Sequence, residues 1–166
     1  KDHRFYRFFH LPVQCGSNEV LKKMRRMHDV DSFVKCVEIL RRELNPSIAT
    51  DIIVGFPGET DGDFAMSMEL LKKTQPDIVN ISRYGPRKGT EAARMPQLPS
   101  QIVKQRTVEM YNLVREIMLS RNREWVGWRG TIKFIEKKKT VIGRTPTYKP
   151  VAVDDVPLGT IADVEI

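Results

Sequence analysis

The segment Thr50-Asp-Ile-Ile-Val-Gly-Phe-Pro-Gly-Glu-Thr60 indicates the fold class more clearly than any other stretch of the sequence. Its apolar run at residues 52–54 is typical of a strand that is covered on both faces. The Pro-Gly pair that follows turns the chain, and Thr60 with Asp63 is typical of a helix start. The segment therefore predicts a buried strand, a tight turn and a helix, which is the repeating unit of a parallel β/α protein.

The segments on either side repeat this alternation of strand and helix. The predicted strands are residues 5–13, 48–56 and 77–82, and the predicted helices begin at Ser17, Asp31 and Thr60. A complete β/α barrel has eight parallel strands, and three strands cannot close such a sheet. We therefore expect residues 1–99 to be half of a partial β/α barrel that belongs to a larger protein.

The rest of the sequence has a different pattern. A loop rich in Gly and Pro at residues 84–99 leads to a predicted long helix over residues 100–124, with Ser100 as its cap. After Trp125 apolar residues alternate with charged ones, which is typical of short antiparallel strands. The fold class is thus α/β: the half barrel, a connecting helix, and a small antiparallel β-barrel or sandwich at residues 125–166.

Composition excludes several classes of protein. The 166 residues include 28 Lys and Arg against 21 Asp and Glu, and the net charge of +7 points to a polyanionic partner. No apolar run approaches the ~20 residues that a membrane span needs, and no secretory signal pattern is present. Two cysteines, Cys15 and Cys36, cannot build a disulfide scaffold or a four-cysteine metal site, so we expect a cytoplasmic protein. The sequence starts at Lys1 without Met, which suggests a processed or shortened chain.

Two predicted strand ends carry residues that could bind a ligand. Gly55, Phe56, Pro57, Gly58 and Glu59 follow one strand, where glycines let a ligand approach the backbone and the amides of a helix start attract anions. An ordinary tight turn is an equally good interpretation of this loop.

The second strand end carries Gln14 and Ser17, which could face a ribose. A role for Ser17 as a helix cap alone is favoured. His10 has no partner at ligand spacing, and Cys15 is predicted to be a small buried thiol. We find no Ser-His-Asp or Cys-His set, so residue types alone give only a weak case for an enzyme.

Basic residues of the last segment raise a separate hypothesis, a non-catalytic adaptor that binds RNA through its phosphates. Lys137-Lys138-Lys139 is more typical of a solvated hairpin tip than of a binding site. The residues that would contact RNA are Lys133, Lys137, Lys138, Lys139, Arg144 and Lys149. Trp125 and Trp128 could stack on bases, although packing of the long helix on the β module is the favoured interpretation.

Taken together, several motifs resemble the second half of the radical S-adenosylmethionine (radical SAM) domain of the tRNA methylthiotransferases. The motifs are residues 10–17 (HLPVQCGS), residues 50–60, Asn80-Ile-Ser82 and residues 86–93 (PRKGTEAA). The terminal β module resembles the TRAM domain that ends these enzymes, through Gly143-Arg144, residues 148–151 (YKPV) and Gly159. Met95-Pro-Gln-Leu-Pro99 and Trp125-Val-Gly127 are most similar to the archaeal and eukaryotic branch.

This resemblance implies a fold, a reaction and two cofactors for the full-length parent. These enzymes have a partial barrel of six strands that binds S-adenosylmethionine beside a 4Fe-4S cluster. The archaeal and eukaryotic branch adds a methylthio group to threonylcarbamoyladenosine beside the tRNA anticodon. The residues that match cofactor-contacting positions are Gln14, Ser17, Asp51, Gly55, Phe56, Pro57, Gly58, Glu59 and Arg87.

The sequence departs from the family where the chemistry takes place. The cluster-binding signature Cys-x-x-x-Cys-x-x-Cys is missing, and Cys15 and Cys36 are too far apart to replace it. We therefore expect an inactive C-terminal fragment whose partners are tRNA and the missing N-terminal part, with no metal ligands or catalytic residues of its own. Its open half barrel predicts self-association or exchange of segments between copies. A methylthiotransferase for isopentenyladenosine or for a ribosomal protein is an open alternative.

Overall fold

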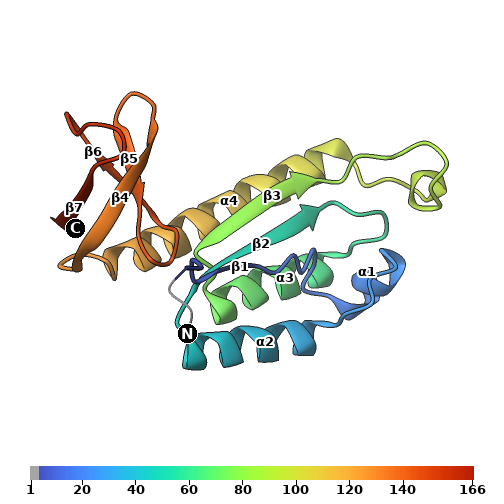
Figure 1. Ribbon diagram of the computed structural model, residues 1–166. Coiled ribbons are helices and arrows are strands. Elements are labelled where there is room, and N and C mark those ends of the chain that lie inside the picture. Colours follow the sequence, from blue (N-terminus) through green and yellow to red (C-terminus); the bar gives the residue numbers. More distant parts are fainter. Residues whose placement is uncertain (1–3) are drawn as a thin grey trace.

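The computed structural model describes residues 4–166 as an α/β part and a β module joined by a long helix (Figure 1). The start at Lys1 lies outside the described residues. The α/β part comprises β1 (Phe8–His10), α1 (Asn18–Lys23), α2 (Val30–Glu43), β2 (Ser47–Val54), α3 (Asp61–Thr74), β3 (Ile78–Arg83) and the short 3-10 helix η1 (Ala92–Arg94). Helix α4 (Ser100–Arg123) leads to β4 (Arg129–Lys137), β5 (Val141–Arg144), β6 (Pro150–Val153) and β7 (Ile161–Glu165).

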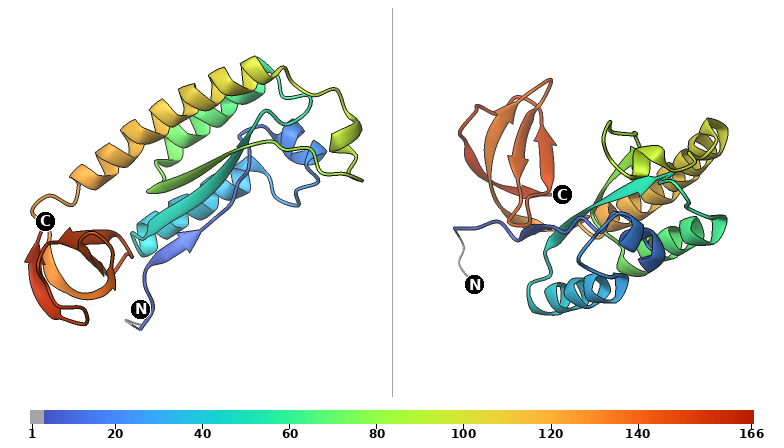
Figure 2. Two further views of the ribbon diagram at one scale, coloured as in Figure 1. Left: turned by 90° about the horizontal axis from the view of Figure 1, so that it is seen from above. Right: turned by 90° about the vertical axis from the view of Figure 1, so that its right-hand side faces the viewer.

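The three strands of the α/β part form a parallel sheet in the order β1-β2-β3, as the alternation of elements predicts. Helices α2 and α3 cover one face of this sheet, and α4 runs back along β3 (Figure 2). The main core lies between this face and the helices and includes Ile52, Leu71, Val79 and Met110. The predicted α/β class with a second, antiparallel sheet is thus confirmed.

The predicted start signals of two helices are confirmed. The Ser17 side chain caps α1 by accepting a hydrogen bond from the Val20 N–H at 3.5 Å. Thr60 and Asp63 form a reciprocal capping box at the start of α3, with N···O distances of 3.1 and 2.9 Å. Each bond satisfies an N–H group that has no partner within the helix.

Two other local predictions were wrong. The strand predicted over residues 5–13 is limited to Phe8–His10, because Arg7 donates its N–H to Pro146 of the β module and Pro12 has no N–H for a ladder. Ser100 does not cap α4. It is the first helical residue, and the preceding Pro99 offers no side-chain cap.

The β module is an antiparallel sheet in the order β6-β5-β4-β7, which curls around a small core in Figure 2. Ile132, Phe134 and Val141 form this core, with Trp128 packed against it. Gly143 lies so close to the core that an added Cβ would be 2.9 Å from Ile132. The contact of Trp128 supports the packing interpretation of that residue.

The β module contacts the α/β part at the amino ends of the parallel strands. Tyr148 packs its ring 5.5 Å from that of Phe8, and Lys149 lies 3.1 Å from the carboxylate of Asp77, just before β3. The loops that follow the strands lie at the other end of the sheet (Figure 1). Helix α4, with 24 residues, is about 36 Å long and connects the two ends. No helix within residues 4–166 is long and apolar enough to cross a membrane.

Candidate functional site

A cavity of about 780 Å³ opens at the carboxyl ends of the parallel strands. This volume is typical of sites for small molecules and cofactors. Its lining comes from the last residues of β2 and β3 and from the loops after all three strands, and it includes Gln14, Asp51, Phe56, Ser82, Tyr84 and Arg87. Ligands of parallel β/α proteins bind at this end of the sheet, because the variable loops gather there.

Gln14 is held in the cavity by its own backbone. Its φ of +75° lies in the left-handed region, yet its backbone pairs with β2. Its N–H donates to the Asp51 carbonyl at 2.8 Å, and its carbonyl accepts from the Ile53 N–H at 2.9 Å. A non-glycine residue with positive φ is strained, and such strain is typical of functional sites. Arg26 donates a hydrogen bond to the side-chain oxygen of Gln14 at 3.3 Å, which fixes the amide against the cavity wall.

Asp51 belongs to a polar row on the face of the sheet that the helices leave uncovered. Its Oδ1 lies 3.0 Å from His10 Nε2 and accepts a hydrogen bond from Asn80 at 2.8 Å. Partial burial opposes ionisation, but the bonds from Asn80 and His10 outweigh it and lower the pKa of Asp51. His10 therefore has a carboxylate partner from the neighbouring strand, which the spacing in the sequence could not reveal.

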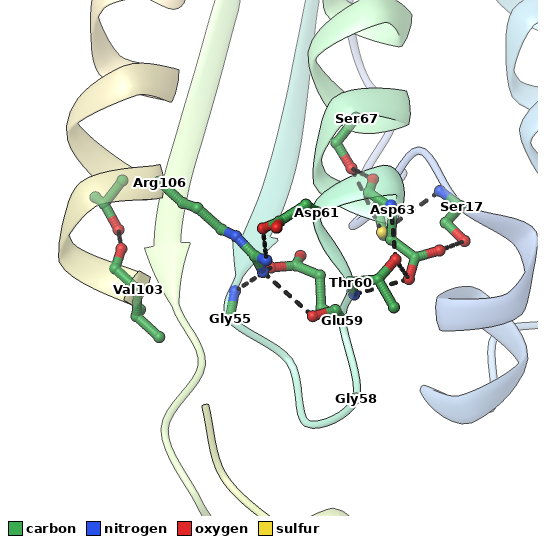
Figure 3. Close-up of polar contacts among 12 residues, drawn as sticks. Ser17, Gly55, Gly58, Glu59, Thr60, Asp61, Asp63, Ser67, Val103 and Arg106 are labelled. Carbon is green, nitrogen blue, oxygen red and sulfur yellow. Dashed lines mark hydrogen bonds and ion pairs between the residues drawn. The ribbon is translucent and has the colours of Figure 1, made fainter. Parts of the chain in front are cut away.

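The loop after β2 is held by a buried ion pair that the sequence did not reveal (Figure 3). Glu59 accepts a hydrogen bond from the Gly55 N–H at 3.0 Å and pairs with Arg106 of α4 at 2.7 Å. The other arm of Arg106 pairs with Asp61 at 2.5 Å. Burial raises the pKa of Glu59, and the bonds from Gly55 and Arg106 oppose this shift. One feature of the sequence could have pointed to Arg106: it is a charged residue on the otherwise buried inner face of α4.

Ser17 also serves the framework of the loops. It is buried and donates a hydrogen bond to Asp63 at the start of α3 (Figure 3). The structure thus brings four of the predicted cofactor residues to the cavity wall and places five elsewhere. Those on the wall are Gln14, Asp51, Phe56 and Arg87, and those that do not line it are Ser17, Gly55, Pro57, Gly58 and Glu59.

Known proteins match this chain in sequence and in fold. Residues 1–71 match the radical SAM superfamily. The probable threonylcarbamoyladenosine tRNA methylthiotransferases of Pyrococcus horikoshii and Archaeoglobus fulgidus are each 40% identical to the chain, over 100% and 98% of its length. The chain is a relative of the archaeal tRNA methylthiotransferases of the radical SAM superfamily. It spans about two fifths of the length of these curated relatives, with 40% and 39% of each covered.

Two further comparisons concern a bacterial relative and the fold. The tRNA-2-methylthio-N(6)-dimethylallyladenosine synthase of Ehrlichia canis is 39% identical over 83% of this chain and 33% of its own length. The radical SAM enzyme coproporphyrinogen III oxidase (HemN) of Escherichia coli superimposes with a TM-score of 0.59 at 19% identity, over 67% of this chain and 27% of HemN. This second likeness supports the fold alone.

The two cofactors of radical SAM enzymes fit this chain unequally. The cavity offers S-adenosylmethionine an aromatic wall, where Phe56 and Tyr84 lie 5.2 Å apart, and polar groups from Gln14 and Asp51. Residues 4–166 offer no site for an iron-sulfur cluster, because they hold no group of three or more His, Cys, Asp or Glu that could bind a metal. Cys15 is buried beside Ser67, its pKa is raised by that burial, and Cys36 is exposed elsewhere.

The predicted RNA-binding residues lie in two kinds of surroundings. Lys133 and the hairpin tip Lys137-Lys138-Lys139 are exposed, and Lys138 pairs with Glu136 at 2.8 Å. Arg144 stacks over Tyr148 and lies 3.4 Å from Glu136. Lys149 is largely buried between Asp77 and Asn122, where it joins the two parts of the molecule.

Proposed function

We propose that this chain is the second half of the barrel, with a TRAM-like RNA-binding module, of an enzyme that adds a methylthio group to threonylcarbamoyladenosine next to the tRNA anticodon. The proposal depends on the strand-end cavity, which lies where radical SAM enzymes bind their cofactor. The whole of this chain also matches archaeal proteins that are named for this reaction. The three predicted parts, residues 1–99, 100–124 and 125–166, would divide the work between cofactor and RNA. Such an enzyme acts in the cytoplasm, where tRNA is modified.

The extent of the matches favours threonylcarbamoyladenosine over dimethylallyladenosine. The archaeal relatives match 98–100% of the chain, whereas the Ehrlichia canis synthase matches 83% at nearly the same identity. The difference in coverage therefore separates the two groups better than the identity does. Analysis of the modified nucleoside in tRNA decides between the two substrates.

In this proposal S-adenosylmethionine occupies the strand-end cavity and supplies the methyl group and the radical chemistry of the family. Phe56 and Tyr84 contact its adenine, while Gln14 and Asp51 bind polar groups of the ribose and the methionine part. Arg87, which is exposed at the rim, contacts cofactor or RNA. Arg106 acts indirectly: through Glu59 and Gly55 it positions the loop that carries Phe56.

The 4Fe-4S cluster of such an enzyme needs cysteines from a segment outside these 166 residues. The chain by itself is then inactive, and its first partner is the part of the parent that supplies those cysteines. The outer strands β1 and β3 of the parallel sheet offer the edges for that partner. In its absence we expect two copies to associate, which light scattering at several protein concentrations would detect as a mass above 19.2 kDa.

A second candidate, an RNA-binding adaptor without catalysis, is favoured by one observation. The exposed lysines of the β module need no cofactor to bind phosphates, and no cluster ligands lie within residues 4–166. An adaptor would bind tRNA and leave its methylthio nucleosides unchanged.

Nucleoside analysis of tRNA separates the two candidates. In cells that lack the gene, the proposal predicts that 2-methylthio-threonylcarbamoyladenosine disappears while threonylcarbamoyladenosine accumulates. The intact gene should restore the product. Unchanged levels of the methylthio nucleoside would refute the enzyme and leave the adaptor, whereas loss of the dimethylallyl product would reassign the substrate.

A further inference from the structure

A second cavity, of about 710 Å³, lies between the N-terminal segment and the β module, at the end of the sheet away from the first cavity. We call it the junction groove. Arg7 fixes one wall by donating its N–H to the carbonyl of Pro146 at 2.9 Å. Figure 2 shows the N-terminal segment running beside the curled sheet of the module. The groove is therefore a space between two parts of the molecule that are held by a backbone hydrogen bond.

The charge on the groove walls has one sign. The lining side chains in the described part of the chain include Arg4, Arg7, Lys133 and Arg144 and no carboxylate. Lys133 and Arg144 are paired directly across β4 and β5. Like charges at opposite positions of two strands repel and destabilise the sheet. Glu136 contacts Arg144 at 3.4 Å but lies outside the groove, so an anion in the groove would relieve the remaining repulsion.

Two aromatic side chains stand in the same groove and remain open to solvent. Phe5 is 72% exposed and Tyr6 is 47% exposed, and Tyr6 rests its ring 4.9 Å from that of Tyr148. Aromatic rings beside cationic side chains are the usual components of a site for single-stranded nucleic acid, in which bases stack and phosphates pair. A purely anionic ligand would use the cations and leave the exposed ring of Phe5 without a contact.

We propose that the junction groove binds an unpaired nucleotide of the RNA substrate. Its phosphate lies against Lys133 and Arg144, and its base stacks on Phe5 and Tyr6. The inference rests on the proposed function for the presence of RNA. The groove is separate from the lysine tip at residues 137–139, and it extends the contact from the β module to Phe5 and Tyr6 of the N-terminal segment.

The test measures RNA binding by the complete 166-residue chain with fluorescence anisotropy. The probes are a labelled single-stranded RNA of about eight nucleotides and a duplex of the same length. The variants are Phe5→Leu, which keeps apolar bulk but loses the stacking face, and Lys133→Ala, which removes one phosphate contact. Lys104→Ala, an exposed lysine on the first turns of α4, is the matched control for charge. Circular dichroism melting establishes that each variant is folded.

The two variants should weaken binding in different ways. Phe5→Leu should weaken binding of the single strand at least about five-fold with an unchanged salt dependence, because stacking does not release counterions. Lys133→Ala should weaken binding and lower the slope of log K against log salt by about one. Lys104→Ala should bind like the natural sequence.

Three outcomes would overturn the groove as a nucleotide site. These are binding of single strand by both variants at the affinity of the natural chain, a preference of the natural chain for duplex, and equal binding of an acidic peptide that displaces the RNA. None of these outcomes tests the proposed enzyme activity, which is tested by the level of the methylthio nucleoside in cellular tRNA. If that nucleoside persists while the groove variants lose RNA, the groove is retained and the enzyme is rejected.

Discussion

Two buried carboxylates hold opposite ends of the parallel sheet, and they are arranged differently. Glu59, at the carboxyl end, is 5% exposed and pairs with one cation, Arg106. Asp77, at the amino end, is 4% exposed and is surrounded by three cations. These are Arg41 at 2.9 Å, Lys149 at 3.1 Å and Arg121 at 3.4 Å.

The pKa values of the two groups shift in opposite directions. Burial raises the pKa of Glu59 despite Arg106. Burial also opposes ionisation of Asp77, but the Ile48 N–H and the three cations more than compensate and lower its pKa. Three cations act on Asp77, whereas Glu59 has one cation and also lies near the negative charge of Asp63, which raises its pKa further. The β module is thus joined to the sheet at a carboxylate with three cations, whereas the loop after β2 is held at a carboxylate with one.

Of the proposed substitutions, Asp77→Asn should lower the free energy of unfolding the most. The variant leaves three cations around a neutral side chain at a buried junction, so the free energy of unfolding should fall by about 3–5 kcal/mol. Urea denaturation followed by circular dichroism measures the change. Asp154→Asn, at an exposed position, is the control and should change stability by less than ~0.5 kcal/mol. A loss below about 1 kcal/mol for Asp77→Asn would mean that the cluster does not fasten the module.

Arg106→Gln should have the next largest effect, on the loop end alone. The substitution leaves Glu59 buried with its bond from Gly55 but without a cation, which should cost about 2–3 kcal/mol of stability. It should also weaken binding of S-adenosylmethionine, because the loop that carries Phe56 loses its anchor. Calorimetric titration of the folded variant measures the affinity, and Arg106→Lys should restore part of it. Unchanged affinity would remove Arg106 from the positioning role.

The two carboxylates should change stability in opposite directions as the pH rises. The folded-state pKa of Asp77 is below its ordinary 3.8, so its contribution is complete above that pH and is lost as the pH falls through the lowered value. The folded-state pKa of Glu59 is above its ordinary 4.5, so its ionisation costs stability as the pH rises from 4.5 through the raised value. Unfolding curves of Glu59→Gln should lack this second decline. An identical decline in both proteins would contradict the assignment.

Lys149→Met should change stability less than Asp77→Asn, Arg106→Gln or Glu59→Gln. Asp77 keeps Arg41, Arg121 and the Ile48 N–H in this variant, so we expect a loss of about 1 kcal/mol or less. The cost lies in the junction, because Lys149 also donates to Asn122 at 3.0 Å. Thermal melting measures the loss. A decrease as large as that of Asp77→Asn would show that one cation alone carries the junction.

The sequence predicted the elements better than the contacts between them. Apolar runs and capping residues such as Thr60 and Asp63 act within a few residues, so they located β2 and the start of α3. The pairs that shape the two ends join residues 47 and 72 positions apart, as in Glu59–Arg106 and Asp77–Lys149. Local patterns do not encode such pairs, and for this reason Glu59 was predicted to be a ligand residue although it holds the loop. Gln14 could be expected at the cavity because the ends of parallel strands meet at one edge, whereas Asp51 was named only from the family resemblance.

Hydrogen exchange with and without S-adenosylmethionine tests the central claim most directly. If the carboxyl end of the sheet is the cofactor site, saturating cofactor should slow amide exchange in the segments around Gln14 and residues 51–59. Exchange in the β module, at the other end of the sheet, should be unchanged. Protection confined to residues 125–166, or no protection at any cofactor concentration up to the millimolar range of weak binding, would contradict the account.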